Sequence, residues 1–129
     1  MAHMVGDIAY RVSVEENRIE ILEYVCRTVR GGRAFYVHKI PGVTWVKHSR
    51  KHGDYGWAPH VHPDFRRNLL VDRKISHTGM ARSKKAALRL ELAAERKRLA
   101  FWKKKGNDEL VSDCERDICR LQQALRRAA

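Results

Sequence analysis

The period of the apolar residues changes once along this chain, and that change constrains the fold more than any other feature. Before about residue 80 apolar residues alternate with polar ones, as at Ile8, Tyr10, Val12 and Val14. Such alternation is typical of a strand with one buried face. After that point the apolar residues recur every three or four positions, which is the spacing of an amphipathic helix. The sequence therefore predicts an α+β protein with its strands first and its helices last.

Turn signals divide the first part of the chain into short strands. Gly31 and Gly32 stand between the runs RIEILEYVCRTVR and RAFYVHKI, and a glycine pair in that position predicts a two-residue hairpin. Pro41 and Gly42 predict a second turn, after which VTWVKH is a short fourth strand. NLLVDRKIS resumes a strand after an irregular loop over residues 48–67. We therefore expect an antiparallel β-meander of four to five strands within residues 5–78.

The second part predicts two helices. Ser83 is a suitable N-cap for a helix from about Lys84 to Lys105, and Gly106 ends it. Asn107 caps a second helix, and the short Gly-Asn link makes the two helices an antiparallel hairpin over residues 83–128. An apolar seam follows the second helix: Val111, Cys114, Ile118, Leu121 and Leu125. The seam is suited either to this intramolecular hairpin or to a homodimer.

Length and cysteine content limit the class of protein. A chain of 129 residues is typical of a single domain, which we expect to span residues 1–129. The opening MAHM is typical of a cloning remnant over residues 1–4, with Met4 as the native start. The three cysteines show no CxxC spacing, which argues against a disulfide framework and favours a reducing compartment. No apolar run approaches a membrane span and no signal peptide is visible, so we expect no membrane partner.

The charge of the chain indicates the class of partner. Lys and Arg number 27 against 15 Asp and Glu, which gives a net charge of +12. Such an excess attracts polyanions, nucleic acid above all. The first predicted helix is especially basic, although Glu91 and Glu95 are spaced to pair with some of its cations. The tip WKKKGN is not compensated nearby, and its aromatic residues also suit docking to a protein.

The stretch WVKHSRKHGDYGWAPHVHPDFRR, residues 45–67, combines basic and aromatic residues in one loop. Basic side chains contact phosphates while aromatic rings stack on unpaired bases. The alternative is that the rings pack inward and only anchor the loop. From this loop and the first helix we expect the following nucleic-acid-binding residues: Lys47, Arg50, Lys51, Tyr55, Trp57, Arg66, Arg67, Lys84, Lys85, Lys103, Lys104 and Lys105.

Two further patterns in this region suggest other chemistry. His60 and His62 form an H-x-H that offers two nitrogens to one metal ion, but no motif supplies the remaining ligands. Asp64, Asp72 and Lys74 form P-D-x7-D-x-K, which resembles the metal-dependent nucleases of the restriction-endonuclease-like superfamily. That resemblance implies a carboxylate pair for Mg²⁺ and a lysine near the attacking water. It covers twelve residues, with a short gap and no helix ahead of the motif.

A short meander containing RAFYVHKI, followed by ARSKKAAL at the start of a charged helical hairpin, resembles the small accessory proteins of bacteriophages. That resemblance implies a cytoplasmic protein of the bacterial host cell that binds a macromolecule, without a cofactor. We therefore favour a nucleic-acid-binding protein over an enzyme. The first alternative is a modulator or inhibitor that binds an acidic or nucleic-acid-binding host protein, such as a polymerase or a defence nuclease. The second alternative is the small metal-dependent nuclease.

Overall fold

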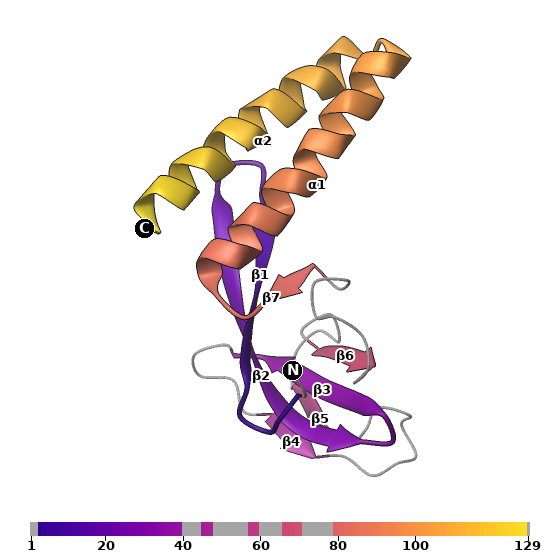
Figure 1. The fold of residues 1–129 in the computed structure, drawn as a ribbon, viewed down its shortest axis with the longest axis vertical. Helices are drawn as coiled ribbons and strands as arrows, with labels where there is room; N and C mark the ends of the chain where they lie inside the picture. The colour runs from indigo at the N-terminus through magenta and orange to yellow at the C-terminus, as the bar shows by residue number, and fades with distance from the viewer. Residues whose placement is uncertain (1–2, 40–44, 48–56, 60–65, 71–78, 129) are drawn as a thin grey trace. The chain divides into compact units, whose positions relative to one another are not determined.

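A computed structural model describes residues 3–39, 45–47, 57–59, 66–70 and 79–128, the three short middle segments by their backbone alone. The elements follow one another as strands and then helices (Figure 1). The strands are β1 (Ile8–Val14), β2 (Ile19–Arg30), β3 (Arg33–His38), β4 (Trp45–Lys47), β5 (Trp57–Pro59), β6 (Arg66–Leu70) and β7 (Met80–Ala81). The helices are α1 (Lys84–Lys105) and α2 (Asp108–Arg127). The predicted α+β class, an antiparallel sheet followed by a C-terminal helical hairpin, is confirmed.

Strands β1, β2 and β3 form the predicted meander. The turn between β2 and β3 consists of Gly31 and Gly32, whose φ angles are 61° and 75°. Two successive positive φ angles are those of the hairpin turn that matches the twist of antiparallel strands, and glycine adopts them without a steric cost. The β2–β3 ladder runs from Tyr24 opposite His38 to Arg30 opposite Arg33, with an irregularity between Cys26 and Thr28.

The fourth strand of the sheet is not the one that the sequence indicated. The sheet order is β6-β3-β2-β1-β7, while β4 pairs with β5 in a separate two-stranded sheet. The place beside β3 belongs to β6, which pairs from Arg33 opposite Leu70 to Val37 opposite Arg66. β6 forms a ladder of five residue pairs with β3, whereas β4 is three residues long. The prediction that VTWVKH continues the meander was therefore wrong.

The interval 48–67, expected to be an irregular loop, contains regular structure. β5 lies within it and pairs with β4 from Trp45 opposite Pro59 to Lys47 opposite Trp57. Gly53, Gly56, Pro59 and Pro63 predicted that no long helix or strand would run through this interval, and β5 is indeed short, with three residues. Pro59 is the last residue of β5, and both strands of a two-stranded sheet are edge strands, where proline is tolerated. The predicted turn at 41–42 lies outside the described residues.

Contacts divide the chain into two compact units, Met1–Ala9 with Leu22–Thr78, and Tyr10–Ile21 with Gly79–Ala129. In the first unit, Tyr24, Cys26 and the run Ala34–Val37 are buried. His3 is also buried, and its Nδ1 lies 2.8 Å from the Tyr36 hydroxyl. His3, which the sequence suggested was part of a cloning remnant, is thus packed within this unit.

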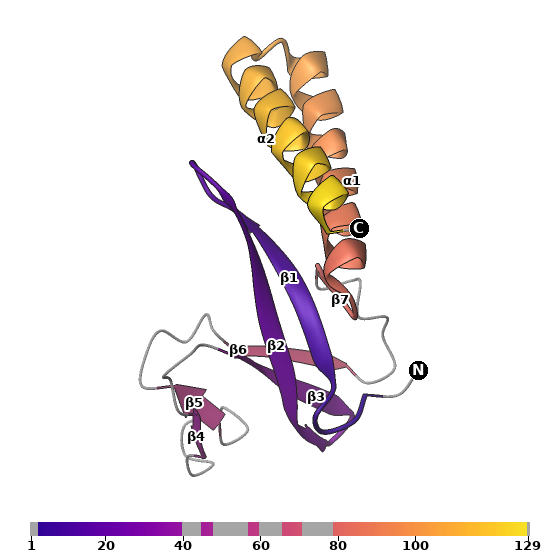
Figure 2. The ribbon, with the colours of Figure 1, turned by 90° about the vertical axis from the view of Figure 1, so that its left-hand side faces the viewer.

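The second unit is built around the helical hairpin (Figure 2). The Ser83 side chain accepts a hydrogen bond from Ala86 N, as an N-cap does, and α1 ends at Gly106 with a φ of 72°. The Asn107 side chain accepts from Leu110 N at the start of α2. Both predicted caps and both helix ends are therefore confirmed. The buried core of this unit consists of Val12, Ala81, Ala87, Leu88, Leu92 and Leu121.

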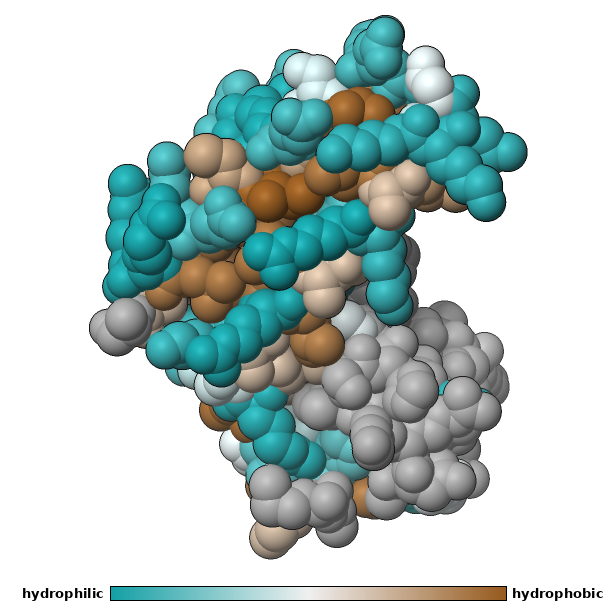
Figure 3. All heavy atoms as spheres, turned by 45° about the horizontal axis from the view of Figure 1, so that its top comes forward, coloured by the Kyte–Doolittle hydropathy of each residue, from teal (hydrophilic) through white to brown (hydrophobic). Residues whose placement is uncertain are grey.

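The apolar seam of α2 faces this core. Cys114 and Leu121 are buried, and Ile118 and Leu125 are half-buried against the core. In this chain the seam packs within the hairpin, which is one of the two uses that the sequence left open. Figure 3 shows that, on the face drawn, an apolar band runs along the hairpin between hydrophilic side chains.

Candidate nucleic-acid interface

Positive charge is concentrated on one of the two helices. α1 carries nine Lys or Arg residues against two Glu, whereas α2 carries four Arg against five Asp or Glu. Two of the acidic residues of α2, Asp108 and Glu109, lie in its first turn, where a negative charge suits the helix dipole. The surplus charge of the hairpin therefore belongs to α1 and not to both helices equally.

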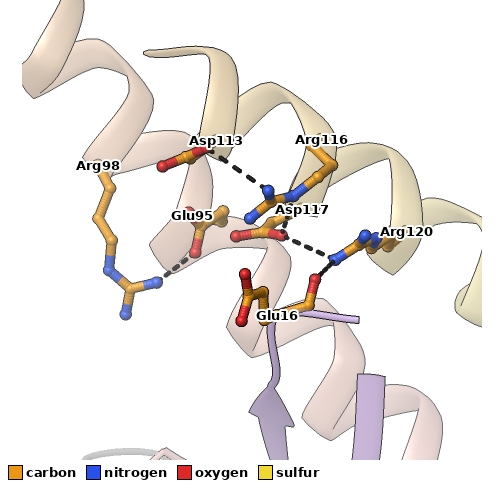
Figure 4. A network of polar contacts seen from close by, with 7 residues as sticks. All are labelled: Glu16, Glu95, Arg98, Asp113, Arg116, Asp117 and Arg120. Atoms are coloured by element: carbon orange, nitrogen blue, oxygen red, sulfur yellow. Dashed lines mark hydrogen bonds and ion pairs between the residues drawn. The ribbon is translucent and has the colours of Figure 1, made fainter. Parts of the chain in front are cut away.

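Both carboxylates of α1 pair with the same arginine. Glu95 is 5% exposed, and Arg98 Nη1 donates to Glu95 Oε2 (Figure 4). The same guanidinium nitrogen lies 3.2 Å from Glu91 Oε1. Burial opposes the charge on Arg98, but the hydrogen bond to Glu91 and the charge of Glu95 outweigh it, so the pKa of the guanidinium is raised. Both acidic residues of α1 are thus committed to Arg98.

A second set of ion pairs lies on α2 (Figure 4). Arg116 Nη1 is 3.5 Å from Asp113 Oδ1, and its Nε is 3.3 Å from Asp117 Oδ1. Arg120 Nη1 lies 3.7 Å from the same Asp117 oxygen and donates to the Glu16 carbonyl at 2.6 Å. Arg116 is thus paired within α2, and Arg120 links α2 to the β1–β2 turn.

Four basic residues of α1 remain in a line. Lys85, Arg89, Arg96 and Lys103 are exposed, and none forms an ion pair within the part of the chain that the structure describes. They are four, seven and seven residues apart, so at 3.6 residues per turn they point within a sector of about 40°. At 1.5 Å per residue they extend over about 27 Å of the helix. We name these four residues the α1 stripe.

Small residues border the α1 stripe. Ala93 and Ala100 are exposed and lie on the same side of the helix, between Arg89, Arg96 and Lys103. Because the alanine side chain is a single methyl group, the surface between the long basic side chains lies close to the helix backbone.

The tip of the hairpin adds aromatic surface. The Phe101 side chain is 50% exposed, and its ring makes an edge contact with Trp102 at 4.8 Å between centroids. Lys105 Nζ lies 5.6 Å from the centre of the Phe101 ring, close enough for a cation–π interaction. Lys103 and Lys104 are also exposed in this last turn of α1. The tip thus combines charge with an accessible aromatic face.

The structure describes part of the predicted site. Lys85 and Lys103 belong to the α1 stripe, Lys104 and Lys105 are exposed near the tip, and Lys84 begins α1 with its Nζ 5.9 Å from the Tyr10 ring. Only backbone is described for Lys47, Trp57, Arg66 and Arg67, in strands β4, β5 and β6. The other predicted loop residues lie outside the described residues: Arg50, Lys51, Tyr55, and the alternative metal and nuclease residues His60, His62, Asp64, Asp72 and Lys74.

Of the four residues of the α1 stripe, Lys85 and Lys103 were among the predicted binding residues, and Arg89 and Arg96 were not. Their signal was present in the sequence, because the helix bounds were predicted and the spacing of the four residues follows from them. The predicted binding residues on α1 were confined to its two ends. Within the described ranges, no group of three His, Cys, Asp or Glu is placed to hold a metal ion.

Comparisons with known proteins do not assign the chain to a family. The sequence matches no protein-family model, no curated protein and no solved structure at a significant level. Among the described residues there is also no helix with the length and apolar character needed to cross a membrane.

Proposed function

We propose that this protein binds nucleic acid through the α1 stripe, with the predicted basic and aromatic loop as a second contact. The observation that carries the proposal is the line of four exposed cations without a carboxylate partner among the described residues. Lysine and arginine that neutralise phosphates release condensed counterions, which drives binding to any polyanionic strand. A span of about 27 Å corresponds to about eight base pairs at 3.4 Å each.

The composition of α1 favours binding without sequence preference. α1 contains no Asn, Gln, Ser or Thr, the uncharged side chains that read base edges by hydrogen bonds. Phosphate contacts fix position on the strand and carry no sequence information. We therefore expect a dissociation constant in the range of about 10⁻⁴–10⁻⁶ M at physiological salt, as for non-specific binding.

The salt dependence of binding tests the proposal quantitatively. The four phosphate contacts of the α1 stripe contribute about −3.6 to the slope of log K against log salt on duplex DNA and about −2.8 on a single strand, and contacts from the loop make the total slope steeper. Fluorescence anisotropy of a labelled oligonucleotide between about 50 and 200 mM salt measures this slope. The double variant Arg89→Gln/Arg96→Gln removes two contacts, so its slope on duplex should be shallower by about 1.8.

A matched control separates a local surface from general charge. Arg27→Gln/Arg30→Gln removes the same charge from two exposed positions of β2. If the α1 stripe is the interface, this control keeps nearly the wild-type slope. Equal losses in the two double variants, or no binding of DNA or RNA at low salt, would refute the proposal.

The exposed Phe101 at the hairpin tip favours one alternative, docking to a protein partner such as a host nucleic-acid enzyme. Under that alternative, a partner is retained from a nuclease-treated bacterial lysate by the wild-type chain and lost by Phe101→Ser. The nucleic-acid proposal predicts instead that nuclease treatment removes whatever the wild-type chain retains. A cytoplasmic location in a bacterial host stays part of the proposal.

A further inference from the structure

A pocket of about 580 Å³ lies within the second unit, away from the residues of the α1 stripe. One wall is the β1–β2 turn and the start of β2, the other is the C-terminal half of α2, and Lys84 contributes from the start of α1. Its volume is within the range of small-molecule sites, about 300–1,000 Å³. The two walls are tied together, because Arg120 donates to the Glu16 carbonyl in the turn at 2.6 Å (Figure 4).

The polar lining of the pocket is mainly cationic. Arg18, Lys84, Arg120 and Arg127 all line it. Arg18 pairs with Glu20, and Arg120 is shared with Asp117 and the turn. Lys84 and Arg127 are exposed and have no carboxylate partner among the residues that the structure describes. The pocket therefore offers more positive charge than the protein itself neutralises.

The rest of the lining consists of apolar and amide side chains, which a site for a bare inorganic ion does not need. Ile19 and Ile21 on one wall and Ala124 on the other give the pocket apolar surface, where a flat organic group gains contact area. Asn17 and Gln123 add side-chain amides, which both donate and accept hydrogen bonds. Apolar surface beside amides and several cations suits a molecule that carries an aromatic base and a dianionic group.

We propose that this pocket binds a nucleoside monophosphate group, either as a free mononucleotide or as the 5′-phosphorylated end of a strand. A phosphate monoester carries about −1.5 to −2 charges, which matches several cations better than a single carboxylate does. Arginine forks bind phosphate oxygens in pairs of hydrogen bonds. The base lies on Ile19 and Ile21, with an amide of Asn17 or Gln123 at its edge. This inference does not depend on the α1 stripe.

Isothermal titration of the full-length protein with AMP, adenosine and inorganic phosphate tests the proposal. We expect AMP to bind at least about tenfold more tightly than adenosine or phosphate alone, because each probe loses one half of the contacts. Comparable affinity for phosphate and AMP would overturn the assignment of the base, and absence of AMP binding would overturn the whole proposal.

Other basic residues of the same helices provide matched controls. Lys84→Gln and Arg127→Gln should each weaken AMP binding about tenfold, since each removes a charge-assisted hydrogen bond. Lys97→Gln and Arg126→Gln change exposed basic residues of the same two helices, which neither line the pocket nor belong to the α1 stripe, and should leave AMP binding unchanged. Equal effects in a lining residue and its control would contradict the site. Ala124→Leu narrows the apolar wall and should reduce the advantage of AMP over phosphate.

Two oligonucleotides distinguish the source of the monophosphate. A 5′-phosphorylated hexamer that binds more tightly than its 5′-hydroxyl form, with the difference lost in Lys84→Gln, identifies a strand end. An unchanged hexamer affinity together with Lys84-dependent AMP binding identifies a free nucleotide. Failure of AMP with an intact effect of Arg89→Gln/Arg96→Gln on oligonucleotides refutes the pocket and leaves the proposed function standing.

Discussion

Replacing Arg98 by Gln removes the cation from a carboxylate that the hairpin buries. The Glu95 side chain is 6% exposed, whereas that of Arg98 is 52% exposed. The two ends of this ion pair therefore depend on each other unequally. Without Arg98, the Glu95 charge stays inside the hairpin without its guanidinium; without the Glu95 charge, the guanidinium still reaches water.

The expected magnitudes follow from that asymmetry. Leaving one charge of a buried pair without its partner costs about 3–5 kcal/mol, and we reduce this to about 2–3 kcal/mol because water screens the exposed end. Glu95→Gln should cost about 1 kcal/mol, since the amide oxygen still accepts a hydrogen bond from Arg98. Arg116→Gln is the control: Asp113 is 48% exposed and Asp117 keeps Arg120, so the loss should stay below about 1 kcal/mol.

Urea unfolding followed by the helical circular-dichroism signal measures the three free energies of unfolding. We expect the loss of free energy of unfolding to be largest for Arg98→Gln, smaller for Glu95→Gln and smallest for Arg116→Gln. That order supports the assignment of Glu95 as a buried carboxylate. If Glu95→Gln destabilises the protein as much as Arg98→Gln, then an unpaired Glu95 charge is not the cause of the loss in Arg98→Gln, and the reasoning is refuted.

Three other predictions concern the second unit. Leu88 is fully buried, so Leu88→Ala should lower the free energy of unfolding by about 2–5 kcal/mol, and the half-buried Leu90→Ala by less, in the same urea assay. Gly106→Ala places a side chain at a φ of 72° and should cost about 1–2 kcal/mol, measured as a lower urea midpoint, whereas Asn at this position should cost less. Burial, with hydrogen bonding to Glu95, raises the pKa of the Cys114 thiol from 9.0 to about 11, so a thiol reagent at neutral pH should modify the exposed Cys119 first. The folded protein keeps a proton that the unfolded chain releases, so the contribution of Cys114 is complete below pH 9 and is lost as the pH rises to about 11; Cys114→Ser should lack this decrease.

The helices were predictable because their signals are local. Ser83, Gly106 and Asn107 mark helix ends by the chemistry of one or two residues, and the apolar spacing between them sets the buried face. The glycine pair at 31–32 marks its hairpin in the same way. No long-range information was needed to place any of these features.

Strand partners were not predictable from the same kind of signal. The alternation in VTWVKH and in the run that contains β6 is similar, and the sequence does not say which of the two pairs with β3. The choice depends on ladders between residues far apart in the chain. The pocket was missed for the same reason, because Arg18 and Arg127 are separated by most of the sequence.

The charge surplus was visible in composition, but its distribution was not. The helical half of the chain appeared basic throughout, yet α2 is slightly acidic and α1 carries the excess. Arg116 and Arg120 contribute to the positive charge of the composition, but in the structure both form ion pairs with Asp117. The α1 stripe becomes apparent only when the paired arginines are set aside.

Val12, from the first strand, and Leu121, from the last helix, belong to one core. During synthesis on the ribosome, β1 leaves the exit tunnel before α2 has been synthesised. Val12 therefore cannot pack against the side chains of α2 at that stage. The core of the second unit can therefore form only after α2 has been synthesised, and until then Val12 lacks its partner Leu121.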